Sequence, residues 1–586
     1  MTNDEKANLH TLVMKTMQNF SKLSIDEQAY SSLSSWIDDF PYLVDSAGIC
    51  KAEYRKKGTE TSYWITPISS FLAVAKRLVF LDQPRVDLML RYSDGISVKE
   101  IIVDRVESLS KFGIKSLLEK GISFNESRCE LLSAYLLWSE QQAPIESVHF
   151  RLGWLEKNGT YIFRGYESAS AGEISVSHYC GSLNLAPHGD LQKWLGMIHH
   201  DVLPYLPLTF CMLLGFASPV LSRLFERHDL GTLAFCISNE SSRGKTTAAM
   251  LASSVFSCPF LGQGTVQSFH ATQNFLTNFL SAASGFTVIL DEGATYSGDF
   301  NQLFYLITAG KDKRRLGKDG TMKEPLFWNN IVITTAEFLP VNDDSANGIR
   351  TRCFNITDNI TKDAAHSDRI KAAISENYAL AGPIFIQWLL NTPDVKLEED
   401  YDDCIRILYD HFNNTGMKSG PFTDRIFSKF AIILQVANYT AQCFDWDFSP
   451  DDLIPYLIQL ERNVSTQTDP IQRSLEILLS EVSRNSGRYI TDSNLQPSNC
   501  VGKIQQDGEH KIIAMLQSEF NDICKKNGLQ PKFVLRNLRE RQILDCERDR
   551  LSKRVRLRHN LPEQVCYVIK IFDPKTETRK DLFKNE

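Results

Sequence analysis

The sequence predicts an α/β core, flanked by an α+β N-terminal domain, a helical connector and a small basic C-terminal domain. Two observations predict the core: the apolar strand LAFCIS (233–238) runs straight into NESSRGKT (239–246), and the apolar strand in GFTVILDEGA (285–294) ends in two acids. Long apolar strands of this kind are typical of parallel sheets covered by helices on both faces. A third observation, a surplus of lysine and arginine near the C-terminus, predicts the basic domain.

Length and composition indicate an ordinary soluble protein of several domains. The chain has 586 residues, of which 43% are hydrophobic and 23% charged, and its formal net charge is −7. This length exceeds what one hydrophobic core supports. Its 13 cysteines form no C-x-x-C pair, which is typical of reduced thiols in the cytoplasm. We therefore expect a cytoplasmic protein.

An uncharged apolar stretch and a loose group of histidines are the candidates for a membrane span and a metal site. Residues 202–221 carry no charge, but three prolines interrupt them, which favours two buried helices over a membrane span. His188, His199 and His200 gather loosely near Cys180, but their spacing matches no pattern of metal ligands. We expect neither a membrane anchor nor a metal ion at these places.

The stretch NESSRGKT has the form of a phosphate-binding loop. It fits the pattern G-x-x-x-x-G-K-[ST], except that Asn239 stands where the first glycine is usual. Asn tolerates left-handed backbone better than most residues, so we expect a working loop. In such loops Gly244 would let the backbone approach the phosphates, Lys245 would reach the β- and γ-phosphates, and Thr246 would hold Mg²⁺. The expected nucleotide contacts are Asn239, Glu240, Ser241, Ser242, Arg243, Gly244, Lys245, Thr246 and Thr247.

The second apolar strand would carry the catalytic acids. Asp291 and Glu292 lie at its carboxyl end, where ligands bind in parallel sheets. Asp291 suits a role at Mg²⁺, and Glu292 is placed to polarise the attacking water, which only a hydrolase requires. An exposed acidic turn is the alternative reading. Together with the loop, these acids predict an enzyme that binds and hydrolyses ATP with Mg²⁺.

Two later stretches complete the predicted catalytic set. FWNNIVITTAEF (327–338) reads as a strand in which Thr335 suits a sensor of the γ-phosphate. NGIRTRCFNI (347–356) reads as another strand, from which Arg350 or Arg352 would reach the ATP of a neighbouring subunit as an arginine finger. A plain surface arginine is the alternative for either residue.

A basic segment lies between the acidic strand and the sensor strand. Residues 311–323 hold six Lys/Arg and two Asp, for a net charge of +4, and Lys318-Asp319-Gly320-Thr321 predicts a hairpin turn. Such a hairpin would contact the phosphates of a single DNA strand in the channel of a ring. A solvated charged loop is the alternative. The expected contacts are Lys311, Lys313, Arg314, Arg315 and Lys318.

The C-terminal segment is more basic still. Residues 525–558 hold twelve Lys/Arg and four acids, for a net charge of +8. Residues 510–526 and 531–544 read as helices, and residues 554–558 and 564–572 read as the two strands of a hairpin. This combination predicts a winged helix that reads duplex DNA, with a protein-binding winged helix as the alternative. The expected contacts are Lys532, Arg536, Arg539, Arg554, Arg556 and Arg558.

Four stretches carry a resemblance to a known family: SSRGKTTAAMLASSVF, VILDEGA, GKDKRRLGKDG ahead of a tryptophan, and TTAEF. They resemble a helicase-like ATPase family of phages and bacterial mobile elements that is filed as a domain of unknown function. The self-loading replicative helicases of staphylococcal cassette chromosomes and pathogenicity islands belong to it, and these are hexameric AAA+ relatives of the minichromosome maintenance helicases. The likeness spans roughly residues 60–400.

The resemblance implies a P-loop AAA+ core, with ATP contact at Gly244, Lys245 and Thr246 and catalysis at Asp291 and Glu292. It also implies that Arg350 or Arg352 acts as the arginine finger. The chain departs from the pattern at Asn239, and the sensor strand ends in Thr-Thr-Ala where asparagine is usual.

These patterns together predict five segments. They are an N-terminal helical segment (1–60), an α+β domain (61–200) that includes a hairpin over 149–165 with an Asn-Gly turn, an AAA+ ATPase core (201–395), a helical lid or connector (396–485) and a winged helix (486–586). The predicted function is ATP-driven DNA unwinding by a ring, as a hexamer, at the origin of a mobile element. The alternatives are a remodelling or anti-phage defence ATPase, and a DNA-binding initiator that uses ATP as a switch.

Overall fold

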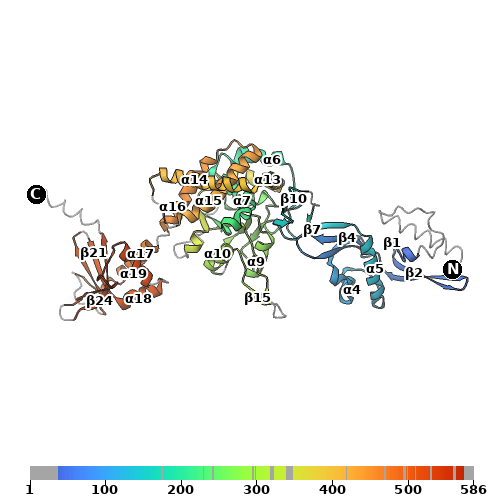
Figure 1. Ribbon diagram of the computed structural model, residues 1–586, viewed down its shortest axis with the longest axis horizontal. Helices are drawn as coiled ribbons and strands as arrows, with labels where there is room; N and C mark the ends of the chain where they lie inside the picture. Colours follow the sequence, from blue (N-terminus) through green and yellow to red (C-terminus); the bar gives the residue numbers. More distant parts are fainter. Residues whose placement is uncertain are drawn as a thin grey trace. The chain divides into compact units, whose positions relative to one another are not determined.

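The structure is a computed structural model (Figure 1). Two compact units make up the chain. One unit comprises Met1–Phe338, Ile356–Cys404 and Ala431–Leu453, and the other comprises Leu339–Asn355, Ile405–Phe430 and Ile454–Glu586. The structure describes residues 37–572, except 173–175, 229, 240–242, 294–295, 297, 317–321, 338–346, 418, 421, 468–469, 492–496, 498, 509, 528, 530 and 559–561.

The described part of the N-terminal region is a mixed domain of helices and sheets. Its first sheet is β1 (Tyr42–Asp45), β2 (Gly48–Lys57) and β3 (Glu60–Ser69). The second has the order β11-β7-β4-β5-β6, from His178–Tyr179, Ile145–His149, Leu72–Phe80, Val86–Ser93 and Val98–Asp104. The helices are α3 (Arg105–Leu109), α4 (Lys111–Ser116) and α5 (Cys129–Gln142).

The predicted helical segment over residues 1–60 is wrong for residues 42–57. Residues 1–36 lie outside the described part of the chain, residues 37–39 are helical, and Tyr42–Asp45 and Gly48–Lys57 form strands. Tyr42, Val44 and Ile49 from these strands share one apolar core with Leu132 and Leu136 of α5. The strands therefore belong to the α+β domain.

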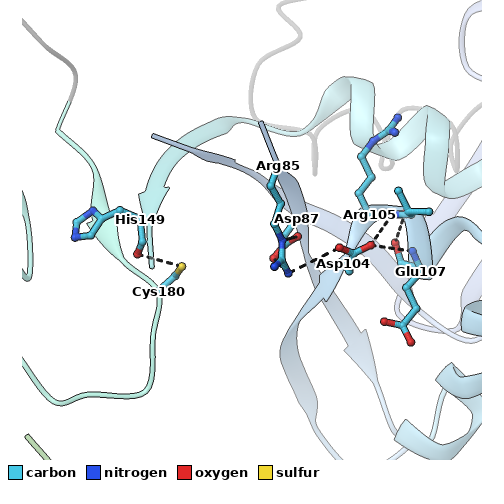
Figure 2. A network of polar contacts seen from close by, with 9 residues as sticks. Arg85, Asp87, Asp104, Arg105, Glu107, His149 and Cys180 are labelled. Carbon is cyan, nitrogen blue, oxygen red and sulfur yellow. Dashed lines mark hydrogen bonds and ion pairs between the residues drawn. The ribbon is translucent and has the colours of Figure 1, made fainter. Parts of the chain in front are cut away.

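Ion pairs cover part of the second sheet, as Figure 2 shows. Nε and Nη2 of Arg85 each lie 2.8 Å from a carboxylate oxygen of Asp87, and Arg85 also approaches Asp104 at 3.8 Å. Asp104 caps α3 by accepting the backbone N–H groups of Val106 and Glu107. These contacts hold the edge strand β6 and the start of α3 against β5.

His149, at the end of β7, is a buried polar residue with both ring nitrogens engaged. Its Nε2 lies 2.7 Å from the carbonyl oxygen of Gly165, and its Nδ1 lies 2.9 Å from Oγ of Ser177. Burial lowers the pKa of this imidazole to about 4. The ring is therefore neutral near pH 7.

The predicted hairpin over 149–165 is confirmed as β8 (Gly153–Lys157) and β9 (Thr160–Arg164), and β9 also pairs with β10 (Ser168–Ser170). Asn158 and Gly159 have φ of 52° and 73°, the left-handed pair that a two-residue turn requires. The hairpin is tied to the core, because the backbone N–H of Leu152 donates to Ala282 at 2.8 Å and Nε1 of Trp154 donates to the Pro219 carbonyl at 2.9 Å.

The prediction of two helices over residues 202–221 is wrong. After α6 (Leu191–Met197) and a π-helical turn (Ile198–Val202), one helix, α7, runs from Leu206 to His228 with Pro219 inside it. Residues Leu206–Phe225 are long and apolar enough to span a membrane, but 83% of their most apolar window is buried inside the protein. Packing against the core accounts for the absence of charge.

The α/β core is a five-stranded sheet with the order β13-β14-β17-β12-β18. β13 pairs with β14, β14 with β17, and β17 with β12, all in parallel. The strands are β12 (Leu233–Ser238), β13 (Val266–Ser268), β14 (Val288–Asp291), β17 (Ile331–Ala336) and β18 (Cys353–Ile356). Since β17 lies between β12 and β14, the strand of the phosphate loop and the strand of the acids are not neighbours.

Three helices alternate with these strands: α8 (Lys245–Ser254), α9 (Gln273–Ala282) and α10 (Phe300–Ala309). The apolar strands that the sequence predicts here are confirmed, and every residue of β12, β14 and β17 is buried. The predicted strand over 347–356 is only half right, because Asn347–Arg350 form the short helix α11 and the strand begins at Cys353.

The chain from residue 364 to 484 is helical, as the sequence predicts for its later part. The helices are α12 (Ala364–Glu376), α13 (Ala381–Leu390), α14 (Asp394–Asn414), α15 (Thr423–Phe444), α16 (Ile454–Gln467) and α17 (Pro470–Arg484). Leu478 and Val482 of α17 lie in the apolar core of the C-terminal domain. Core packing therefore places α17 with that domain, ahead of the predicted start at residue 486.

The C-terminal domain combines α17, α18 and α19 with a sheet of order β19-β20-β21-β24-β22, in which β23 also pairs with β24. Its elements are β19 (Tyr489–Ile490), β20 (Gly502–Asp507), β21 (His510–Leu516), α18 (Gln517–Lys526), α19 (Pro531–Glu540), β22 (Leu544–Asp545), β23 (Lys553–Val555) and β24 (Gln564–Phe572).

One prediction for this domain needs correction, and one is confirmed. Residues 510–516 form a strand rather than the start of a helix. The predicted hairpin exists as β23 and β24, although β23 ends at Val555.

Candidate nucleotide site and nucleic-acid surfaces

The phosphate loop leads directly into α8. Gly244 has φ of 88°, and a Cβ at this position would lie 2.7 Å from the side chain of Thr361. Only glycine fits both the left-handed backbone and this close approach. Lys245 follows as the first residue of α8. Glu240, Ser241 and Ser242 lie outside the described residues.

Asn239 does not play the part that the sequence suggests. It is not among the described non-glycine residues with a positive φ, so tolerance of left-handed backbone does not explain it. Instead its Nδ2 donates to the carbonyl oxygen of Asp358 at 2.6 Å, and its own carbonyl accepts from Nζ of Lys245 at 2.8 Å. The side chain ties the start of the loop to the segment that precedes α12.

The two acids at the end of β14 are arranged by one threonine. The Thr335 hydroxyl donates to Oδ1 of Asp291 and accepts the backbone N–H of Glu292 at 3.2 Å. Asp291 and Thr335 are 7% and 3% exposed, whereas the Glu292 side chain is exposed. Glu292 also has φ of 62°, an uncommon backbone for a non-glycine residue that often marks functional sites.

One cavity of about 610 Å³ brings the loop and the acids together. It opens at the carboxyl edge of β14 and β17, where α8 begins, and Arg243 is not among its lining residues. The predicted residues that line it are Gly244, Lys245, Thr246, Thr247, Asp291, Glu292 and Thr335. Thr247 is 1% exposed, and its hydroxyl lies 2.6 Å from that of Ser367, so this side chain anchors α8 to α12.

Helix α12 supplies cavity residues that sequence reasoning missed. Ser367, Asp368 and Lys371 line the same cavity as Lys245. No motif marks them, because they lie more than a hundred residues after the loop on a helix of ordinary composition. Only the packing of α12 against α8 brings them to the site.

The cavity suits a magnesium nucleotide by the chemistry of its donors. The Thr246 hydroxyl and the Asp291 carboxylate are oxygen ligands, which Mg²⁺ prefers. Lys245 adds a positive charge beside them, as a phosphate tail requires.

The two candidate finger arginines differ in exposure. Arg350 is 3% exposed, within its own unit of the chain, while Arg352 is partly exposed. Nζ of Lys429 donates to the carbonyl of Thr351 between them, which fixes the turn ahead of β18. A buried guanidinium is poorly placed to reach another molecule, whereas part of Arg352 is open to solvent.

The predicted basic hairpin forms between β15 (Arg315–Leu316) and β16 (Met322–Lys323) and protrudes beyond α9 (Figure 1). Lys311, Lys313 and Arg314 are exposed. The Arg315 side chain and the predicted turn, including Lys318, lie outside the described residues.

The helix α19 presents a basic face to solvent. Lys532, Arg536 and Arg539 are exposed, while Val534, Leu535 and Leu538 are buried. Arg554 and Arg556 near β23 are also exposed. Arg558 differs, because its Nη2 donates to the carbonyl of Pro497 at 2.8 Å and the residue is partly buried.

The protein thus combines a parallel α/β core, whose cavity suits a magnesium nucleotide, with a basic C-terminal domain of helices and strands. Residues 42–326 match the family described as domain of unknown function (DUF927), and residues 469–574 match the Cch helix turn helix domain. No curated protein matches the sequence.

Among solved structures, one described as "SCCmec type IV Cch - active helicase" is similar, with a TM-score of 0.73 and 21% identity over 92% of this chain and 98% of that chain. The chain therefore combines a region that matches DUF927 with a region that matches the Cch helix turn helix domain, in a fold similar to that of the solved Cch structure. The predicted resemblance is confirmed.

Proposed function

We propose that this protein is an ATP-dependent DNA helicase that initiates replication of a mobile genetic element. One observation carries the proposal: a single cavity contains Lys245 and Thr246 from the phosphate loop and Asp291 and Glu292 from β14. The helix-turn-helix domain supports contact with DNA, and the similar solved structure is described as an active helicase.

In the proposed reaction, each side chain of the cavity has a separate task. Lys245 holds the β- and γ-phosphates of ATP, and Glu292 accepts a proton from the attacking water. Thr246 and Asp291 would hold Mg²⁺, which supplies charge neutralisation at the phosphates. The Thr335 hydroxyl keeps Asp291 in place and fixes the backbone of Glu292. Glu292 is thereby oriented before the substrate arrives.

We propose an AAA+ ring, as a hexamer, in which Arg352 of one subunit acts on ATP bound to the next. A guanidinium there would stabilise negative charge in the transition state. The partial exposure of Arg352, against 3% for Arg350, supports this choice. The helices after α12 would form the lid.

We propose that two basic surfaces contact DNA in different ways. The hairpin with Lys311, Lys313 and Arg314 would follow the phosphates of a single strand inside the ring. The face of α19 with Lys532 and Arg536 would bind a duplex. The exposure of these side chains supports both assignments. We expect the protein to act on DNA in the cytoplasm.

A strand-displacement assay on a forked DNA duplex tests the proposal. The wild-type protein should displace the strand with ATP and Mg²⁺, and Lys245→Ala should not. ATP hydrolysis without displacement would instead support a remodelling or defence ATPase. If Glu292→Gln abolished hydrolysis but kept replication initiation, ATP would be acting as a switch. Mass photometry with ATP should find the hexamer.

A further inference from the structure

A second cavity, of about 520 Å³, lies at the base of the basic hairpin. Its walls come from the β8–β9 hairpin, from α7 and from the segment between β16 and β17. Three aromatic residues line it: Trp154, Tyr161 and Phe327. Its volume is in the range of pockets that hold small organic ligands, roughly 300–1,000 Å³.

Backbone pairing joins the wall of the cavity to the base of the basic hairpin. Lys311 pairs with Phe327 in an antiparallel bridge, and the N–H of Asp312 donates to the carbonyl of Leu326 at 2.8 Å. The N–H of Trp328 donates to the carbonyl of Gly310 at 2.9 Å, which closes the base of the ladder. A DNA strand whose phosphates contact Lys311 would therefore pass beside Phe327.

Two of the three arginines that line the cavity are engaged by acids and rings. The guanidinium carbon of Arg223 lies 3.2 Å from the centre of the Tyr161 ring, and this arginine pairs with Asp394. The Arg164 side chain is 8% exposed and pairs with Asp82 at 2.8 Å. The third, Arg151, shares the wall with Glu156 and Glu324, so the cavity carries charges of both signs rather than the cationic lining of an anion site.

Phe327 is the aromatic wall residue that is most open to solvent. It is 59% exposed, whereas Trp154 and Tyr161 are partly buried. An open ring beside polar groups fits a planar aromatic ligand whose edge forms hydrogen bonds, and a nucleobase has this chemistry.

We propose that this cavity holds one nucleobase of a single DNA strand, stacked on Phe327, while the hairpin cations contact the neighbouring phosphates. The inference rests on the proposed function, because it requires a single strand at the hairpin. It adds a base-stacking site to what is otherwise a contact with phosphates.

The test measures the affinity for a fluorescent single-stranded oligonucleotide at several salt concentrations. Phe327→Ala should weaken binding about five- to 150-fold, since stacking on one aromatic contributes that much per base. The slope of log affinity against log salt should not change, because no phosphate contact is lost. Phe327→Trp should retain the affinity, and Phe327→Leu should not.

The matched control is Phe275→Ala. Phe275 is 46% exposed on α9 and is not among the residues that line the cavity. This variant should bind like the wild type. Both variants should unfold in urea at the same midpoint as the wild type, which shows that each one is folded.

An abasic scan of the oligonucleotide identifies the stacked base directly. Replacing that one nucleotide by an abasic site should weaken the wild type and leave Phe327→Ala unaffected. Equal affinity of Phe327→Ala and wild type would overturn the inference and leave the helicase proposal standing. A changed salt slope would also overturn it, because Phe327 would then act by arranging the lysines. If the wild type bound no single strand, the proposed function itself would fail.

Discussion

The nucleotide cavity and the basic hairpin are both polar, but the two regions hold their polar groups differently. In the cavity, Asp291 is 7% exposed and its carboxylate accepts from the buried Thr335 hydroxyl. In the hairpin, Lys311, Lys313 and Arg314 stand exposed. The first region depends on the position of single atoms, and the second depends on the number of charges.

This difference sets how each region should respond to change. When a buried polar group is left without its partner, the protein is destabilised by the full desolvation free energy of that group. An exposed cation contributes a modest, salt-screened attraction that adds to that of its neighbours. Conservative substitutions should therefore be severe in the cavity and mild in the hairpin.

The largest effect should come from Glu292→Gln. The amide cannot accept a proton from water, so the ATP turnover number should fall roughly 10²- to 10⁴-fold while ATP still binds. Steady-state hydrolysis, together with binding of a fluorescent ATP analogue, measures both quantities. A loss of less than fivefold would mean that another group is the base, and the contrast between the two regions would weaken.

Acidification should also lower the stability of the fold strongly, because His149 is a polar group that is buried like those of the nucleotide cavity. Its folded-state pKa of about 4 lies below the ordinary value of 6.5, so its neutral form stabilises the fold above pH 6.5, and this contribution is lost as the pH falls toward 4. The difference is worth about 3 kcal/mol in the free energy of unfolding.

Urea unfolding at pH 7 and pH 4.5 measures this effect. His149→Gln is the matched control, because its amide can donate to the Gly165 carbonyl and accept from Ser177 but does not titrate. The wild type should lose more stability than the variant between these two pH values. An equal loss would show that His149 is charged in the native protein.

The third effect should come from Thr335→Val, which removes the hydroxyl and keeps the shape. A hydrogen bond to a charged group contributes about 1.5–3 kcal/mol, so turnover should fall roughly 10- to 100-fold. Thr335→Ser keeps the hydroxyl and should retain most of the activity. The KM for ATP should change little in both variants. A rise in KM without a fall in turnover would contradict the positioning role.

The smallest effect per residue should come from the hairpin. Replacing Lys311, Lys313 and Arg314 together by alanine should lower the salt slope of single-strand binding by about 2, or about 0.7 for each lost phosphate contact. Hydrolysis without DNA should be unchanged. An unchanged slope would show that these cations are a solvated surface, the alternative reading of this segment.

Sequence patterns predict some of the strands of this protein and miss others. The strands at 233–238 and 564–572 begin and end where predicted, because each is an unbroken run of mostly apolar residues next to a recognisable stop. The pattern failed at residues 510–516, where a strand leads into α18 without a break in hydrophobicity. It failed at residues 202–221 because Pro219 is accommodated inside α7.

The residues of the candidate site also divide into those that the sequence could predict and those that it could not. Lys245, Thr246, Asp291 and Glu292 could be chosen from the sequence, because each belongs to a short motif whose spacing reflects local backbone geometry. The roles of Asn239, Thr335 and Lys371 could not. Asn239 contacts a residue 119 positions away, and Thr335 contacts one 44 positions away.

The sequence by itself determined that the chain has a phosphate loop, a strand ending in two acids and two basic segments, since local composition is enough for each. Tertiary structure alone decided that β17 lies between β12 and β14, which brings Thr335 onto the acids, and that α12 closes the cavity. Contacts between distant segments depend on how the sheet orders its strands, and no local pattern encodes that order.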